Sequence, residues 1–225
     1  GFTDFELKGG VLPGDQEMEC IRAMKKIFPE SRFDLDPNGG WLLNQAVEYV
    51  RGMQGILTYC EDPCGAEGVY SGREIVSEFR RRTGFPTATN MIATDWRQFY
   101  HTVSLNACDI ILADPHFWGF DGAVRMSQLL DSWGLTFGIH SNNHFDITLA
   151  AFAQVGAAAV GNPAPLQVLV HIAPASPSRN RRILEYEFVG FLQVKSVNPS
   201  LPRAGDERRG VVTVEKGGHI TVFLL

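Results

Sequence analysis

Short apolar runs alternate with longer amphipathic segments over most of this chain. The pattern predicts strands at residues 2–7, 33–36, 56–60, 86–90, 109–113, 135–139 and 166–171. Between them it predicts helices at residues 15–28, 42–53, 71–83, 96–105, 119–133 and 147–160. In the first helix, apolar residues recur every third position from Met18 to Ile27. The chain therefore alternates strand and helix about seven times.

Two helix starts carry a capping signal. Asp15 is expected to be the N-cap of the first helix, because a short polar side chain can accept from the unpaired backbone N–H groups there. Ser71 followed by Glu74 three residues later predicts a capping box.

Regular strand–helix alternation predicts parallel strands joined by crossover helices, in a barrel or in a doubly wound open sheet. A polar residue ends each of six successive strands, at intervals of about 24 to 29 residues: Lys8, Asp36, Glu61, Asn90, Asp114 and His140. A (β/α)₈ barrel has units of about 31 residues and builds its site from the carboxyl ends of many strands. An open sheet concentrates its site at one switch point, so we favour an α/β fold of the TIM-barrel type.

The stretch from Gly138 to Asp146 is the most polar of these strand ends. It places His140 directly after a buried strand, followed by Ser141 and Asn142. A histidine there can exchange a proton near neutral pH. A core histidine held by a backbone carbonyl and followed by an Asn-rich turn explains the stretch equally well; the other strand ends favour the functional interpretation.

Composition narrows the class of protein. The chain has 225 residues, a formal net charge of −5 and 44% hydrophobic residues, which argues against a nucleic-acid or membrane surface. We see no signal peptide or membrane-spanning run, and the start within a strand suggests the inside of a longer chain. The four cysteines lack zinc-site spacing, and reduced thiols in a cytoplasmic protein are expected.

The pattern changes after residue 172. Residues 173–180 are rich in Pro, Ser and Ala, and residues 184–197 and 211–225 alternate like strands. We therefore expect a barrel domain at residues 1–172 and a divergent β-rich segment at residues 173–225.

Oxygen donors at three successive strand ends suggest a metal site. Asp36, Glu61 and Asn90 supply the hard ligands that Mg²⁺ prefers, and Glu67 competes with Glu61 as a ligand. A single Asp before Pro is otherwise explained as a turn or a cap.

Lys8 comes before this set in the chain, and Asp114 and His140 come after it. In a closed barrel Lys8 and His140 would face each other across the metal, and Asp114 could bond one ring nitrogen of His140. That arrangement suits removal of a proton next to a carboxylate, with a metal stabilising the enediolate.

Several longer motifs strengthen this interpretation. They are LKGGVLPG at 7–14, LDPNG at 35–39, EDPCGAE at 61–67, TATNMIATDWR at 87–97, ADPHFW at 113–118 and HSNNHFD at 140–146. Over roughly residues 1–155 the chain resembles the barrel portion of the glucarate dehydratases, in the mandelate-racemase-like part of the enolase superfamily. The fold expected from the resemblance is a partial (β/α) barrel that lacks the family's N-terminal capping domain and first strand.

The resemblance implies a Mg²⁺-dependent lyase that converts D-glucarate, and often L-idarate, to 5-keto-4-deoxyglucarate. Lys8, His140 and Asp114 would be catalytic. The metal would lie among Asp36, Asn90 and Glu61 or Glu67. The expected substrate contacts are Glu6, Asp36, Asn38, Asn90, His140, Ser141 and Asn142.

Glu6 departs from the family pattern, in which the strand motif is Lys-x-Lys and a lysine stands at this position. A carboxylate beside Lys8 favours the protonated amine and repels a diacid. The alternative hypothesis is therefore a catalytically impaired fragment or relative that binds a diacid or a partner subunit. Expected partners are a small acid sugar and a second copy in a homo-oligomer, with no nucleic acid or membrane.

Overall fold

The computed structural model describes residues 4–140, 147–160, 167–170, 192–195, 210–215 and 219–224, with side chains described within 4–140 and 150–160. Ser141 and Asn142 lie outside the described residues.

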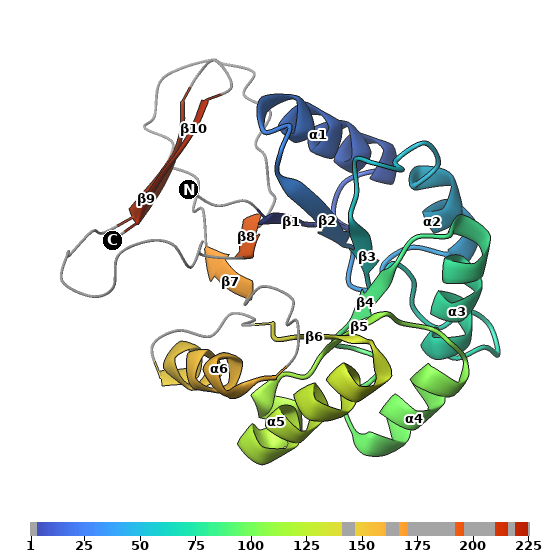
Figure 1. Cartoon of the computed structure of the whole chain (residues 1–225). Coiled ribbons are helices and arrows are strands. Elements are labelled where there is room, and N and C mark those ends of the chain that lie inside the picture. The colour runs from blue at the N-terminus through green and yellow to red at the C-terminus, as the bar shows by residue number, and fades with distance from the viewer. Residues whose placement is uncertain are drawn as a thin grey trace, which may run out of the picture.

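Six parallel strands form a curled half-barrel (Figure 1). They are β1 (Asp4–Lys8), β2 (Arg32–Asp36), β3 (Tyr59–Glu61), β4 (Thr87–Thr89), β5 (Ile110–Leu112) and β6 (Thr136–Gly138). They follow one another in the sheet in chain order, and each pairs in parallel with the next. This confirms the expected α/β fold of partial-barrel type.

The helices lie outside the curled sheet (Figure 1). They are α1 (Gly14–Ile27), α2 (Leu43–Tyr49), α3 (Gly72–Thr83), α4 (Trp96–Ser104), α5 (Pro115–Trp133) and α6 (Ile147–Ala158). α5 begins before the predicted 119 and bends at Gly119, whose φ of 67° only glycine adopts readily. Within the described residues, no helix is both long enough and apolar enough to cross a membrane.

The remaining strands are β7 (Gln167–Val170), β8 (Leu192–Lys195), β9 (Gly210–Glu215) and β10 (His219–Leu224). β8 pairs antiparallel with β1 and with β7, so the half-barrel sheet includes residues on both sides of position 172. β9 and β10 pair with each other. The division into two domains at residue 172 stays a prediction.

Strand alternation sorts the sheet into two faces. Phe5, Leu7, Phe33 and Leu35 pack with α1 residues in one core cluster. Their neighbours in the chain, Glu6, Lys8 and Asp36 among them, therefore lie on the opposite face, since successive side chains of a strand alternate. Glu6, Lys8 and Asp36 thus lie on the concave side of the half-barrel, away from α1.

The two capping predictions have different outcomes. Ser71 caps α3 and forms the expected box with Glu74. Asp15 is not the N-cap of α1: the helix begins at Gly14, and Pro13 occupies the cap position without a side-chain hydrogen bond. Asp15 lies instead in the first turn, where a negative charge suits the helix dipole.

Candidate functional site

The centre of the site is the ammonium group of Lys8. Lys8 Nζ lies 2.9 Å from Glu6 Oε1, contacts Asp36 Oδ2 directly, and lies 4.0 Å from Glu61 Oε1. Glu6 and Lys8 meet because they are two apart on β1, and Asp36 is opposite Lys8 in the β1–β2 register. The lysine side chain is 12% exposed and the carboxylates are fully buried.

The pKa values in this cluster are strongly perturbed. Burial lowers the pKa of Lys8, but Glu6, Asp36 and Glu61 outweigh it and raise that pKa well above its ordinary value. Burial and the nearby Glu61 raise the pKa of Asp36 well above the usual range, although Lys8 opposes them. The three carboxyl groups therefore favour the ammonium form of Lys8.

The carboxylates fit a divalent cation. One oxygen from each of Glu6, Asp36 and Glu61 lies within 4.8 Å of the other two, and all three side chains are buried. Hard oxygen donors at this spacing are the ligand type that Mg²⁺ requires. Asp36 is further fixed by the backbone N–H of Asn38, which donates to Asp36 Oδ1 at 2.7 Å.

His140 closes the other side of the site. Its Nε2 lies 3.5 Å from Lys8 Nζ, and its Nδ1 lies 2.8 Å from Asn90 Nδ2. The carboxamide of Asn90 thus lies within hydrogen-bond distance of the imidazole ring. The contact also leaves Asn90 Oδ1 for another partner.

Asp114 fixes the His140 backbone and lies close to its ring. Its Oδ1 accepts from the His140 backbone N–H at 2.6 Å, and its Oδ2 lies 3.5 Å from Nδ1. Burial raises the pKa of Asp114, while the contacts with His140 act in the opposite direction. A hydrogen bond to the ring was expected from the sequence; the structure shows a hydrogen bond to the His140 backbone, with the ring nearby.

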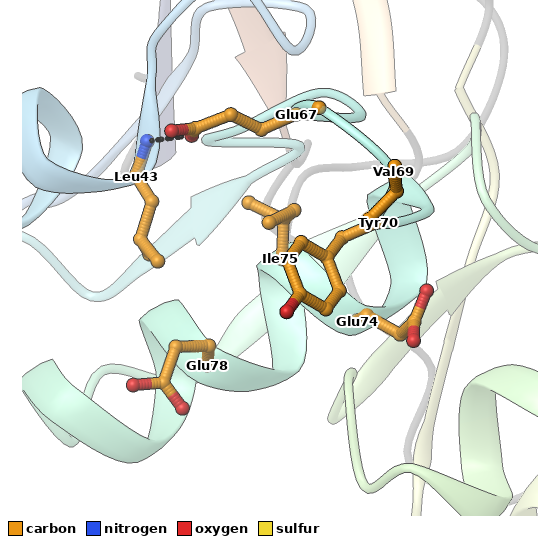
Figure 2. A pocket seen from close by; sticks show the side chains of 8 residues that line it. Leu43, Glu67, Val69, Tyr70, Glu74, Ile75 and Glu78 are labelled. Carbon is orange, nitrogen blue, oxygen red and sulfur yellow. Dashed lines mark hydrogen bonds between the residues drawn. The ribbon is translucent and has the colours of Figure 1, made fainter.

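Glu67, the competing ligand, lies apart from this cluster. Its Oε2 accepts from the backbone N–H of Leu43 at 2.9 Å, at the edge of a surface hollow of about 730 Å³ that Tyr70, Glu74 and Ile75 also line (Figure 2). Within the described residues, the carboxylate group that could hold a metal ion is formed by Glu6, Asp36 and Glu61. The structure therefore brings Glu61, and not Glu67, to Asp36.

Asp62 is a positioning residue that the sequence analysis missed. Its carboxylate accepts from Thr89 Oγ1 at 2.5 Å and from the Asn90 backbone N–H at 3.0 Å. Burial, followed by the charge of Glu61, raises the pKa of Asp62 to about 7. Its φ of 35° is unusual outside glycine. Its place beside Glu61 was the one signal available in the sequence.

Glu17, on α1, was also missed. It is 2% exposed, and its carboxylate accepts from three consecutive backbone N–H groups: Gly10 at 3.1 Å, Val11 at 3.1 Å and Leu12 at 3.0 Å. These residues form the loop that follows Lys8, so Glu17 fixes the end of β1 that carries the site.

Relatives of the chain are known from sequence and from solved structures. A probable glucarate dehydratase of Streptomyces coelicolor is 35% identical over 161 residues, which cover 70% of this chain and 35% of that protein. The chain thus spans about a third of the length of this relative.

Similar shares of this chain and of the relative are covered when the chain is compared with solved structures. An enolase from Pseudomonas fluorescens with bound magnesium, potassium and tartrate is 38% identical, with a TM-score of 0.63 over 69% of this chain and 36% of that one. An enolase from Gibberella zeae with magnesium, formate and sulfate is 31% identical, with a TM-score of 0.63 over the same shares.

The model of the Enolase C-terminal domain-like family matches residues 1–196, most of the chain. The half-barrel and the polar strand ends on its concave face agree with that match. The chain belongs to the Enolase C-terminal domain-like family of the enolase superfamily.

Proposed function

We propose that this chain carries the reacting half of a Mg²⁺-dependent acid-sugar dehydratase of glucarate type. The supporting observation is the convergence of Lys8, His140 and the carboxylates of Asp36 and Glu61 at one end of the half-barrel. The named relative from Streptomyces coelicolor agrees with this reaction class.

In this proposal Asp36, Glu61 and Asn90 would hold Mg²⁺, which would supply positive charge next to the substrate carboxylate. His140 is the group suited to take the α proton, because Asn90 contacts its ring and Asp114 fixes its backbone. It then returns the proton to the departing β-hydroxyl. The expected product of D-glucarate is 5-keto-4-deoxyglucarate, and L-idarate is the second substrate to test.

Lys8 has a different role from that of a ready base. Its close pairing with Glu6 and Asp36 favours the ammonium form, which would donate to the substrate carboxylate and stabilise negative charge. Proton abstraction from that face would need Glu6 to be removed from Lys8.

A second candidate function is favoured by the same contact. If Lys8 cannot act, the site still binds a diacid or a partner subunit without turnover. The 2.9 Å distance between Glu6 Oε1 and Lys8 Nζ is the observation that supports it.

The test is an assay of the purified chain with Mg²⁺ and D-glucarate, following 2-keto acid formation. We expect slow turnover that His140→Gln abolishes and Glu6→Lys increases at least tenfold. Ser77→Ala, a change at a helix residue bonded to a backbone carbonyl on the outer side, is the matched control. No product from the parent or from Glu6→Lys, with glucarate still bound, would reject the dehydratase and support the binding function.

A further inference from the structure

We propose that Glu6 is an additional ligand of the divalent cation, and that the cation displaces the Lys8 ammonium from among the three carboxylates. This inference rests on the proposed function, because it concerns the same metal site. It assigns to Glu6 a role that a lysine at this position could not have.

The geometry is that of a cation site that already contains a cationic group. Lys8 Nζ lies within 4.0 Å of an oxygen from each of Glu6, Asp36 and Glu61. The three oxygens lie within 4.8 Å of one another. A small ion placed among them would reach all three after a small adjustment of side chains, provided that the flexible lysine moves away.

The charge balance supports the same conclusion. Three carboxyl groups share one lysine in a site where the carboxyl side chains are fully buried. Uncompensated buried charge is strongly unfavourable. A divalent cation would cancel it, with Lys8 retained as an ammonium nearby.

The displaced Lys8 has a place to go. Lys8 is the partly exposed member of the cluster, and its Nζ already lies 3.5 Å from His140 Nε2, so the ammonium can move away from the carboxylates on the side of that ring. Metal binding would thus both fill the carboxylate cluster and release Lys8 to meet the substrate. A lysine side chain has enough rotatable bonds for this movement without a change in the backbone.

The test is direct metal binding to the full chain, measured by the loss of the free Mn²⁺ signal in electron paramagnetic resonance and by calorimetry with Mg²⁺. Three variants are compared: Glu6→Gln, Lys8→Met and, as the control, Glu67→Gln. We expect one site in the parent, a Kd at least tenfold higher in Glu6→Gln, and a Kd at least threefold lower in Lys8→Met, where the competing ammonium is gone. Glu67→Gln should stay within twofold of the parent.

Folding of each variant is checked by circular dichroism, and Lys8→Met keeps the test decisive if Glu6→Gln does not fold. Parent-like affinity in a folded Glu6→Gln, weaker binding in Lys8→Met, or no Mn²⁺ binding to the parent would each overturn the inference. The readout is independent of turnover. Tight, Glu6-dependent binding without 2-keto acid formation would reject the dehydratase and leave the metal site standing.

Discussion

Replacing Glu17 by Gln should lower the free energy of unfolding, although Glu17 is not one of the reacting groups. The Glu17 carboxylate is buried and accepts from the backbone N–H groups of Gly10, Val11 and Leu12. In Glu17→Gln one oxygen remains for Val11 and Leu12, but an amide NH₂ replaces the acceptor of Gly10. A donor then faces a donor, and the loop loses the charge that strengthened all three bonds.

Hydrogen bonds to charged groups contribute about 1.5–3 kcal/mol each, and a buried group without a partner costs a further amount of similar size. We therefore expect a loss of about 2–3 kcal/mol in the free energy of unfolding. For a domain of this size that loss lowers Tm by roughly 4–12 °C.

The assay is urea denaturation followed by circular dichroism, beside Glu19→Gln as the control. Glu19 lies on the same helix but is exposed, so its change should stay within about 0.5 kcal/mol of the parent. A Glu17→Gln variant as stable as Glu19→Gln would refute the claim that the buried carboxylate holds the loop after β1.

Two further predictions concern other contacts. Ser71→Ala should lower the free energy of unfolding by about 1 kcal/mol, because it removes half of the capping box with Glu74 at the start of α3. Urea denaturation measures this loss. Ser71→Asp, which keeps an N-cap acceptor, should recover most of it. Asp109→Asn should lower the free energy of unfolding by about 1 kcal/mol at pH 7. Burial raises the pKa of Asp109, but the hydrogen bonds from Arg80 and Thr87 outweigh burial and lower that pKa, so the folded chain favours the ionised carboxylate. A carboxyl group whose pKa is lower in the folded chain stabilises that chain at pH values above its unfolded pKa of about 3.9. The difference in the free energy of unfolding between the parent and Asp109→Asn should therefore shrink as pH falls below about 4. A constant difference from pH 7 to pH 3 would contradict this origin.

Much of the fold was predictable because parallel strands alternate with helices and leave a periodic record in the sequence. Lys8, Asp36 and Glu61 end strands at similar intervals, so the half-barrel brings them together. The shared face of Glu6 and Lys8 follows from their spacing of two, and the structure adds the direct ion pair.

The remainder depends on contacts that local patterns do not encode. Asp62 has a positive φ and accepts a hydrogen bond from Thr89 on the next strand. Glu17 accepts from backbone N–H groups, which every residue type except proline has, so the sequence does not reveal the contact. Glu67 shares a motif with Glu61, yet its loop carries it to Leu43 instead. The N-cap at Asp15 was mispredicted because Pro13 starts the turn earlier.

The strand order has a consequence for how the chain folds. Each parallel strand from β1 to β6 pairs with the next in the chain, so this part of the sheet can grow by adding one βα unit at a time. The pairing of β8 with β1 is different, because it joins Phe5 to Val194 across nearly the whole sequence. Such a loop closure is slow and comes late. We therefore expect Lys8, Asp36 and Glu61 to come together during the early growth of the sheet, before β8 covers the edge of the strand that carries Lys8.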